Sequence, residues 1–215
     1  MKLYHHYKNK PYKFIGTAVH SETLDEVVIY ETLYDNPRGK LWVRPKDMFF
    51  ESIEIENKTV PRFKKIPLTI ESTTQILDEH IKLIAPISEK VFEEWDADWF
   101  FSNLNSHANF HLAIASVSGE VAGFKMGYAR NKFEFYSWFG GVLPEYRGLG
   151  IATELMTAQH EWCQKQGYKR VRTESQNKYP EMLRLNIKNG FEIIGVHASS
   201  RGGMKIVMEK KLLGY

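Results

Sequence analysis

The stretch VLPEYRGLGIA, residues 142–152, contains the residue types best suited to binding a charged ligand. Gly148 and Gly150 lack the side chains that would keep a ligand away from the backbone, and a long helix is predicted to begin directly after them. The first N–H groups of a helix have no intrahelical acceptor and lie at the positive end of its dipole, so a diphosphate can accept hydrogen bonds there. Arg147 adds a cation beside these amides. The residues alone leave one alternative open, in which the two glycines only form a tight turn between a strand and a helix.

Two other phosphate-binding motifs fit this stretch poorly. A nucleotide P-loop needs a Lys-Ser/Thr pair after its second glycine, and the dinucleotide motif needs three glycines at fixed spacing. The sequence provides neither, which weakens both interpretations.

Composition describes a globular protein with a substantial core. The chain has 215 residues, of which 43% are hydrophobic and 26% are charged, so a disordered, collagen-like or disulfide-stapled chain is excluded. Cys163 is the only cysteine, which rules out a structural disulfide, and we expect it to be a buried, inert thiol. The polar start and the lack of any run of 18 apolar residues predict a cytoplasmic protein without a membrane segment.

The charge is unevenly divided along the chain. The formal net charge is +3, and residues 1–65 hold 12 Lys and Arg against 9 Asp and Glu, whereas residues 66–215 hold 17 of each. An excess of this size is much weaker than the dense basic face of a dedicated nucleic-acid-binding protein. We therefore predict no nucleic-acid partner.

The first 65 residues are expected to form a small all-β module. β-branched and aromatic residues are dense in PYKFIGTAV, EVVIYETLY, LWVRP and FFESIEIE. The turn residues DNPRG predict a hairpin between residues 27–34 and 40–44. A domain boundary is expected within residues 60–67, where two prolines bracket a basic stretch that cannot continue a central strand. We divide the chain into residues 1–65 and 66–215.

Residues 66–215 are expected to form an α/β (α+β) fold, with a mixed, antiparallel-dominated sheet flanked by helices. A short strand at LTIE is followed by a helix that opens within residues 72–74. Pro86 is predicted to end that helix, and a second helix is predicted over about residues 88–100.

The rest of this part alternates strands with two further helices. A hairpin is predicted to turn at Ser118-Gly119, and the strand FEFYSWFGGVL leads into the glycine-containing turn. A helix over residues 150–166 follows and ends at Gly167. Strand KRVRTES, helix PEMLRLNIKN and strands FEIIG and KIVMEKKL complete the predicted order.

Residues 142–152 resemble the acetyl-CoA pyrophosphate loop of the GCN5-related N-acetyltransferase (GNAT) family. That family's pattern is matched here by Arg147, Gly148, Leu149, Gly150, Ile151 and Ala152. The likeness extends over residues 68 to about 213, because the order of predicted elements is that family's order. NKYPEMLRLNIKNGFEIIG also resembles its final helix and Gly-Phe turn. The resemblance implies a GNAT-like fold, acetyl-CoA as cofactor and transfer of its acetyl group to a primary amine.

The same resemblance implies how the cofactor's pantetheine arm is held. Gly140, Gly141 and Val142 occupy the strand that pairs with this arm as if it were an extra strand. Glycine inside a strand often marks a bulge, and a bulge here would splay the strand away from KRVRTES; a bend needed only for packing is the alternative. Asn177 and Asn186 are further candidates for contacts with the pantetheine, although packing or capping within the last helix also accounts for Asn186.

The reaction requires removal of a proton from the amine. At pH 7, forming the neutral amine costs roughly 4.6 kcal/mol when its pKa is about 10.4, but only about 1.4 kcal/mol when it is near 8. By resemblance to family members that acetylate protein N-termini, Glu174 stands in the place of the base; a solvated carboxylate at a strand end is the alternative. Asn186 stands where those members have a tyrosine acid. An amide cannot protonate a thiolate, so Tyr136, Tyr179 or water takes that step, or the thiolate leaves unprotonated.

The resemblance also implies where the acceptor amine binds. Its pocket is expected between residues 93–101 and residues 195–203. The carboxylates of the first segment can attract a cationic amine, although a solvated acidic helix face is the simpler interpretation. The acceptor, small molecule or protein, is not revealed by the sequence, and a homodimer is compatible with it.

Residues 1 to about 63 resemble a second family, a small bacterial domain of uncharacterised function. The matching pieces are YHHYKNKPYKFIGTAVHSETLDEVVIYETLY, LWVRPKDMFFE and VPRF, and they imply no activity. Arg44 is the residue we expect first to contact a ligand on an exposed β surface. His5, His6 and His20 are interpreted as exposed strand histidines, so no metal site is predicted.

Two hypotheses follow from these observations. The first is an acetyl-CoA-dependent N-acetyltransferase whose β module recruits or orients an acceptor. The second is a binding protein in which the transferase domain, lacking the usual tyrosine, only senses acyl-CoA. Release of the thiol from acetyl-CoA in the presence of mixed amines distinguishes the two.

Overall fold

The structure is a computed structural model that describes residues 2–93, 95–199 and 202–212. The chain divides into two compact units, the first built on the chain up to Thr69 and the second on most of the chain from Ile70 onward. Each unit is described by itself. The division predicted at residues 65 and 66 stays a prediction.

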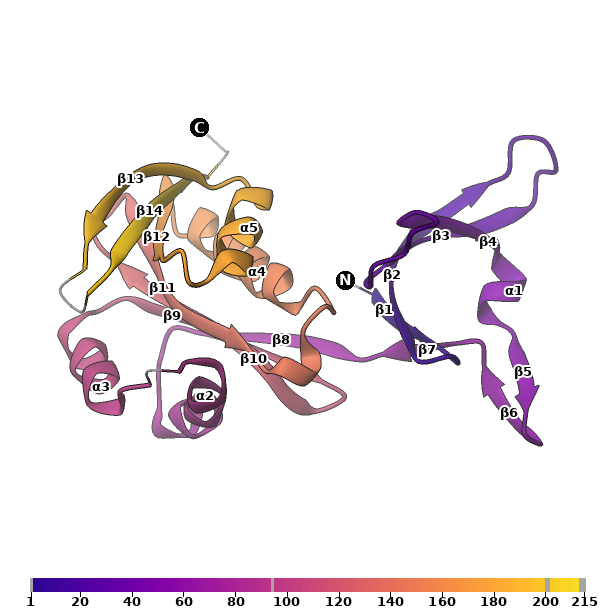
Figure 1. Ribbon diagram of the computed structural model, residues 1–215, viewed down its shortest axis with the longest axis horizontal. Helices are drawn as coiled ribbons and strands as arrows, with labels where there is room; N and C mark the ends of the chain where they lie inside the picture. Colours follow the sequence, from indigo (N-terminus) through magenta and orange to yellow (C-terminus); the bar gives the residue numbers. More distant parts are fainter. Residues whose placement is uncertain (1, 94, 200–201, 213–215) are drawn as a thin grey trace. The chain divides into compact units, whose positions relative to one another are not determined.

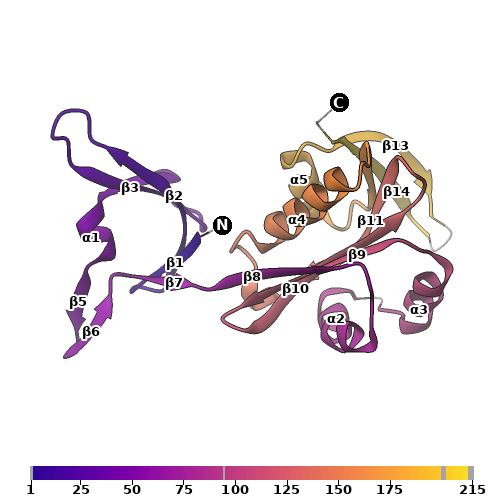
Figure 2. The same ribbon diagram turned by 180° about the vertical axis from the view of Figure 1, so that it is seen from behind.

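The first unit is a curled five-stranded antiparallel sheet (Figures 1 and 2). Its strand order is β4-β3-β2-β1-β7, with the predicted hairpin formed by β3 and β4. A separate two-stranded hairpin, β5 with β6, and a short helix, α1, complete it. The bounds are β1 Lys2–His6, β2 Lys10–Val19, β3 Glu26–Thr32, β4 Leu41–Pro45, α1 Lys46–Phe50, β5 Ser52–Ile55, β6 Lys58–Pro61 and β7 Phe63–Ile66.

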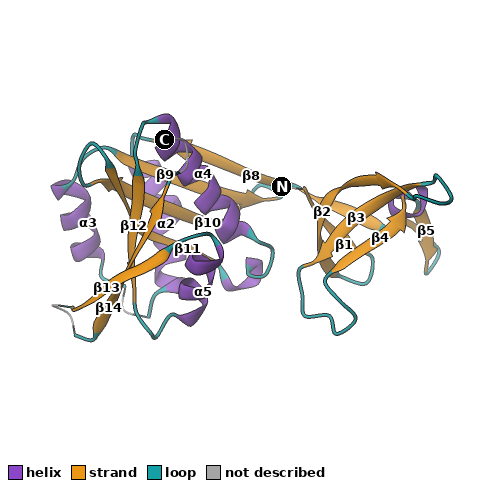
Figure 3. Ribbon diagram, turned by 90° about the horizontal axis from the view of Figure 1, so that it is seen from above, coloured by secondary structure: helices purple, strands orange, loops and turns teal. Residues whose placement is uncertain are grey.

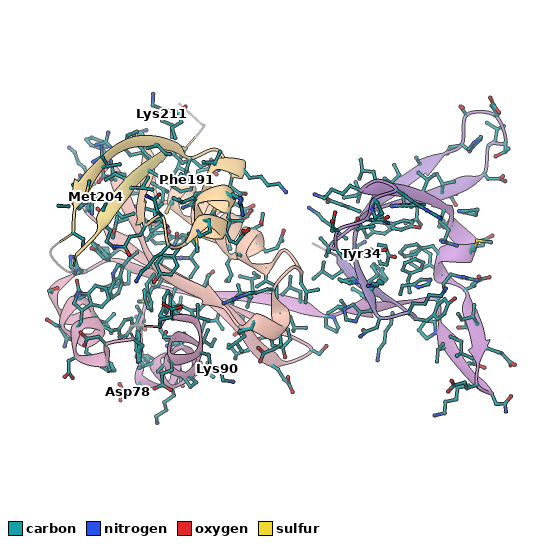
Figure 4. All side chains as sticks on the ribbon, in the orientation of Figure 1. Tyr34, Asp78, Lys90, Phe191, Met204 and Lys211 are labelled. Atoms are coloured by element: carbon teal, nitrogen blue, oxygen red, sulfur yellow. The ribbon has the colours of Figure 1, made fainter. Side chains whose placement is uncertain are left out.

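Aromatic rings fill the inner side of this curled sheet. Phe49 and Phe63 stack with their ring centres 4.1 Å apart, and Tyr4 and Tyr30 lie edge-on or tilted against Phe49. Tyr34, labelled in Figure 4, shares a 2.7 Å hydrogen bond with the hydroxyl of Tyr12. Such rings bury much apolar area per residue, which gives a module of this size a core.

Two expectations for this unit were incomplete. Phe49 and Phe50 were predicted in a strand but lie in α1, because folding them into a helical turn after Pro45 places Phe49 fully inside the aromatic core. The basic stretch between the prolines does form a strand, β7, which lies at the edge of the sheet beside β1. An edge strand needs partners on one side only, which explains why prolines are tolerated at both of its ends.

The second unit is built on a seven-stranded sheet with the order β13-β14-β12-β11-β10-β9-β8. The pairs β10 with β11, β12 with β14 and β13 with β14 are antiparallel, while β11 and β12 are parallel. The predicted hairpin between β9 and β10 turns at Ser118 and Gly119, both with positive φ. The bounds are β8 Leu68–Thr73, β9 Phe110–Val117, β10 Glu120–Ala129, β11 Glu134–Val142, β12 Arg170–Ser175, β13 Glu192–Ala198 and β14 Met204–Lys211.

Helices cover both faces of this sheet (Figures 1 and 2). α2 (Asp78–Val91) and α3 (Ala97–Ser106) lie on one face, while α4 (Ile151–Lys165) and α5 (Pro180–Lys188) lie on the other. Figure 3 shows that these longer helices all belong to the second unit. The expected α+β class with an antiparallel-dominated sheet is confirmed.

The core beneath α4 and α5 is apolar, as the period of these helices predicts. Met156 and Cys163 of α4 pack with Phe135 and Val171 of the sheet and with Phe191, which is labelled in Figure 4. Cys163 is a buried free thiol whose pKa is raised by burial, so it is inert as expected.

The first helix of this unit begins later than predicted and does not end at Pro86. Strand β8 continues to Thr73, and α2 begins only at Asp78. Pro86 lies inside α2 rather than at its end. Pro86 is exposed, and so is Lys82, the residue one turn earlier whose carbonyl loses its donor, so the proline lies on the solvent side of α2.

The second helix was also displaced. It spans Ala97–Ser106 as α3, whereas Ser88 belongs to α2. The start is fixed by Asp96, whose carboxylate accepts a 2.8 Å hydrogen bond from the amide of Trp99. This N-cap was overlooked because the acidic run was interpreted as a helix face. Among the described residues, no helix is both long and apolar enough to cross a membrane.

Candidate active site

The glycine-containing turn connects β11 to α4 as predicted. After Val142 the chain passes through a short 3-10 turn, Pro144–Tyr146, and α4 begins at Ile151. Gly148 and Gly150 have φ of +78° and +77°, in the left-handed region that other residues rarely adopt. Leu149 and Ile151 anchor the turn because both side chains are buried. The glycines are therefore required by the turn itself, whatever else they permit.

This turn presents the donors that an anion needs. The amides of Ile151 and Ala152 lie in the first turn of α4, where helix geometry provides no intrahelical acceptor. Arg147 and Gly148 are exposed, so the turn can be reached from solvent. A helix of 15 residues also contributes the positive end of its dipole at this point. These features fit a diphosphate group.

Strands β11 and β12 separate beside this turn. Within the described residues, their parallel register covers three pairs and ends at Tyr136, opposite Arg172. The hydroxyl of Thr173 then donates a 2.8 Å hydrogen bond to the carbonyl of Ser137, and β12 continues along β14 alone. The rest of β11, as far as Val142, is paired on its β10 side. The predicted splaying of the two strands is confirmed.

The bulge lies at Trp138 and not at the glycine pair. Met126 is opposite Phe139 and Gly127 is opposite Ser137, so Trp138 is the extra residue of β11. Gly140 and Gly141 instead lie where neighbouring residues leave no room for a side chain.

A side chain at either glycine of this pair would collide with the protein. A Cβ on Gly140 would lie 2.8 Å from the carbonyl oxygen of Phe124, and one on Gly141 would lie 2.8 Å from a methyl group of Val91 in α2. The packing alternative raised for this pair therefore has direct support. A contact with pantetheine stays a prediction.

Glu174 lies near the end of β12, as the resemblance implied, and its carboxylate has charged neighbours. One oxygen, Oε1, lies 3.4 Å from a guanidinium nitrogen of Arg130, and the other, Oε2, lies 3.6 Å from Nε2 of His197. The side chain is 18% exposed, so it is accessible without being fully solvated. A carboxylate in such a place can accept a proton from a bound amine.

Tyr136 belongs to the same group of side chains. Arg130, which contacts Oε1 of Glu174, also has its guanidinium carbon 4.0 Å from the ring centre of Tyr136. Burial, and then the negative charge of Glu174, raise the pKa of Tyr136. The phenol is therefore protonated at neutral pH, which is the state of a proton donor. Of the three residues predicted to be catalytic, the structure brings Glu174 and Tyr136 together.

His197 and Arg130 were not singled out from the sequence. Nδ1 of His197 is 3.0 Å from the Ala198 carbonyl, which only accepts, so Nδ1 is the nitrogen that bears hydrogen. Arg130 lies at the end of the β10–β11 hairpin, 44 residues before Glu174. The signal that would find both is the strand order, because β11 next to β12 and β14 next to β13 bring them together.

The remaining predicted residues lie outside this group. Tyr179 is the N-cap residue of α5, with the Lys178 ammonium 5.3 Å from its ring centre. Asn177 is exposed in the turn before α5. Asn186 is 1% exposed, and its amide nitrogen lies 3.6 Å from the sulfur of Met208. Packing accounts for this placement of Asn186, and the roles proposed for these three residues stay predictions.

The expected acceptor segments are described only in part. Glu94, Ser200 and Arg201 lie outside the described residues. In the first segment Asp96 acts as the N-cap of α3, and Trp95 and Phe100 pack against Phe139 of β11. The segment thus contributes aromatic packing on the face of the sheet that carries α2 and α3.

Comparisons with known proteins agree with this geometry. A family model described as acetyltransferase (GNAT) family matches residues 76–191, and one described as protein of unknown function (DUF1653) matches residues 2–65. No curated protein matches the chain.

Several solved structures share the fold. Ard1 from Thermoplasma volcanium is 22% identical, with a TM-score of 0.59 over 68% of this chain and 99% of that chain. A GNAT family acetyltransferase from Elizabethkingia anophelis with acetyl-CoA bound is 16% identical, with a TM-score of 0.56 over 67% and 98%. Arabidopsis thaliana Naa50, in complex with the bisubstrate analogue CoA-Ac-MVNAL, is 16% identical, with a TM-score of 0.54 over 66% and 97%.

The sheet, the glycine-containing turn and the helix that follows it belong to a fold that this chain shares with solved acetyltransferases, one of them with acetyl-CoA bound. The chain belongs to the GNAT family of acetyltransferases, whose model covers more than half of its residues.

Proposed function

We propose that this protein transfers the acetyl group of acetyl-CoA to a primary amine, by direct attack within a ternary complex. The observation that carries the proposal is that Glu174 and Tyr136, which share Arg130 as a neighbour, lie where β11 and β12 begin to separate. The cofactor is inferred from membership of the GNAT family. The roles of base, acid and diphosphate-binding turn are argued from the residues of this chain.

The turn before α4 would hold the diphosphate of acetyl-CoA. The amides of residues 148–152 donate to it, and Arg147 provides a positive charge beside it. Beyond Ser137, whose carbonyl accepts a hydrogen bond from Thr173, no described residue of β12 is paired with β11, so the backbone of β11 can pair with the amides of the pantetheine. When bound, acetyl-CoA supplies an acetyl group activated as a thioester.

Glu174 acts as the base in this proposal. Its carboxylate accepts a proton from the amine nitrogen as the carbon–nitrogen bond forms and the carbon–sulfur bond breaks. Arg130 lies 3.4 Å from Oε1 and fixes the orientation of the carboxylate, which leaves Oε2 for the amine.

Tyr136 acts as the acid and replaces the family's tyrosine, which is Asn186 here. Its phenol gives a proton to the departing thiolate. The phenolate then recovers a proton from Glu174, whose carboxylate is close enough to raise the pKa of Tyr136. One proton is thus taken from the amine and one is delivered to the sulfur, and both residues return to their starting states.

His197 lies beside the proposed base. Its Nε2 is 3.6 Å from Oε2 of Glu174, and its Nδ1 is 3.0 Å from the carbonyl of Ala198. The imidazole therefore borders the place where the amine would approach Glu174.

Release of the thiol tests the proposal against the acyl-CoA sensor. Purified protein is mixed with acetyl-CoA and separate pools of peptides, polyamines, aminoglycosides and amino acids, and free thiol is measured over time. We expect release with at least one pool and an acetylated product by mass spectrometry. Saturable binding of acetyl-CoA without release in any pool would favour the sensor.

A further inference from the structure

Arg44 lies on the inner, aromatic side of the curled sheet in the first unit. In the pairing of β3 with β4 it is directly opposite Val28, which is fully buried in the core of this unit. Residues directly opposite each other in a sheet project to the same face. The guanidinium carbon accordingly lies 5.8 Å from the ring centre of Phe63, on the far edge strand β7.

This guanidinium has no anionic partner among the described residues. Its Nε atom is buried and makes no hydrogen bond, and one terminal nitrogen, Nη1, is 3.3 Å from the sulfur of Met48, a weak acceptor. Arg62 in the same unit shows the ordinary arrangement, with its Nε 2.6 Å from a carboxylate oxygen of Glu51. A guanidinium whose Nε is buried without a hydrogen-bond acceptor points to an acceptor that the chain does not provide.

Aromatic rings surround Arg44. His6 lies with its ring centre 4.8 Å from that of Phe63. Its pKa is lowered to about 4, first by burial and then by the positive charges of Arg44, Arg62 and Lys8, so it is neutral at pH 7. Arg62 is paired with Glu51, and Lys8 is exposed. Of these cations, Arg44 is therefore the half-buried one without a carboxylate partner among the described residues.

These features select one class of ligand. A single guanidinium beside a neutral histidine balances one negative charge, whereas a doubly charged phosphate needs further cations or a nest of amides. The planar fork of arginine matches a carboxylate, and the half-buried rings of His6 and Tyr12 offer apolar surface to a flat body. The excess charge of +3 within residues 1–65 favours an anion as well.

We propose that the first unit is a binding module for a monoanionic carboxylate carried on a flat, apolar group, with Arg44 as the residue that pairs with the carboxylate. Arg44, His6 and Tyr12 are only half-buried, so solvent can reach the sheet at these three residues. The proposal is independent of acetyl transfer.

The test follows the Nε–H signal of Arg44 in the nitrogen-15 spectrum of the full chain, with benzoate as the probe. We expect a saturable shift of this signal with benzoate, and none with benzamide, which has the same shape without the charge. Inorganic phosphate serves as the third titration. A signal that moves with phosphate alone, with benzamide as much as with benzoate, or with none of the three would overturn the proposal.

Two variants separate this site from general surface charge. Arg44→Gln is expected to weaken benzoate binding at least about tenfold, the loss of one charge-assisted hydrogen bond. Arg38→Gln removes the same charge from the exposed β3–β4 turn and is expected to leave binding unchanged. Equal weakening by both variants would contradict a specific site. If Arg44→Gln does not fold, the comparison of benzoate with benzamide on the unaltered chain still decides the matter.

Discussion

At the scale of single residues, the account depends on the carboxylate of Glu174. Glu174→Gln keeps the shape of the side chain but removes its ability to accept a proton, so we expect the kcat for amine acetylation to fall by about 100-fold or more. Acetyl-CoA affinity, measured by calorimetry, is expected to be unchanged. Glu181→Gln, the same change at an exposed site on α5, serves as the control.

Tyr136→Phe tests the acid separately. Removal of the hydroxyl eliminates the proton donor, so we expect a fall in kcat of about 100-fold or more, with KM for the amine less affected. The measurement is steady-state thiol release as a function of pH. A variant with unchanged kcat would reassign the proton transfer to Tyr179 or to water.

The residue scale also shows what could be predicted without coordinates. Glu174 and the glycine-containing turn were found because each belongs to a continuous motif whose spacing is visible in one segment. Arg130 and His197 were missed because they reach Glu174 only through strand pairing between distant segments. Asn186 was noticed as a departure from the family, but its buried contact with Met208 depends on how α5 packs on β14.

At the scale of elements, substitutions at the two ends of α4 distinguish the role of the turn before this helix from the stability of the helix itself. Gly148→Ala forces a side chain into a backbone with φ of +78° and should lower the unfolding free energy by about 1 kcal/mol. It should also weaken acetyl-CoA binding, because the added methyl group lies at the amides that meet the diphosphate.

Gly167→Ala is the matched control for that change. Gly167 follows the other end of α4, has φ of +83° and meets nothing within 4 Å where a Cβ would lie. Gly167→Ala should lower the unfolding free energy about as much as Gly148→Ala does. The affinity for acetyl-CoA, measured by calorimetry, should be unchanged. Equal losses of affinity in the two variants would mean that strain, and not position, is responsible.

Elements differ in how far local sequence determines them. The strands around the β9–β10 hairpin and helix α4 were predicted well because their periodicity and turn glycines agree. The helices α2 and α3 were predicted at the wrong positions because Pro86 was interpreted as the end of a helix. Pro86 lies on an exposed side of α2, and that exposure is a tertiary property that the sequence does not show.

At the scale of the whole molecule, buried histidines predict an acid-sensitive fold. His111 is fully buried, and burial lowers its pKa to about 4; His160 is similarly affected, with a pKa of about 3 from burial and then from Lys210 and Lys125. The unfolded chain, with histidine pKa values near 6.5, binds more protons than the folded chain between about pH 6.5 and 4. Stability is therefore present above pH 6.5 and is lost as pH falls through this window.

Urea unfolding at pH 7.5 and 4.5 measures this loss. His111 alone should account for on the order of 2 to 3 kcal/mol of the difference in unfolding free energy between these two pH values. His111→Phe should reduce the pH dependence by that amount, and His20→Gln, at an exposed site, should leave it unchanged. An identical pH dependence in the chain and in His111→Phe would contradict the assignment.

The most direct test of the central claim is the thermal and chemical stability of the whole chain with and without acetyl-CoA. At about 100 times its dissociation constant, a ligand that binds only the folded state adds about 2.7 kcal/mol to the unfolding free energy. We predict this gain for the unaltered chain and its loss in Arg147→Glu, which places a negative charge beside the diphosphate. An unaltered chain that gains no stability, or an Arg147→Glu variant that gains as much, would contradict the claim that the turn before α4 binds acetyl-CoA.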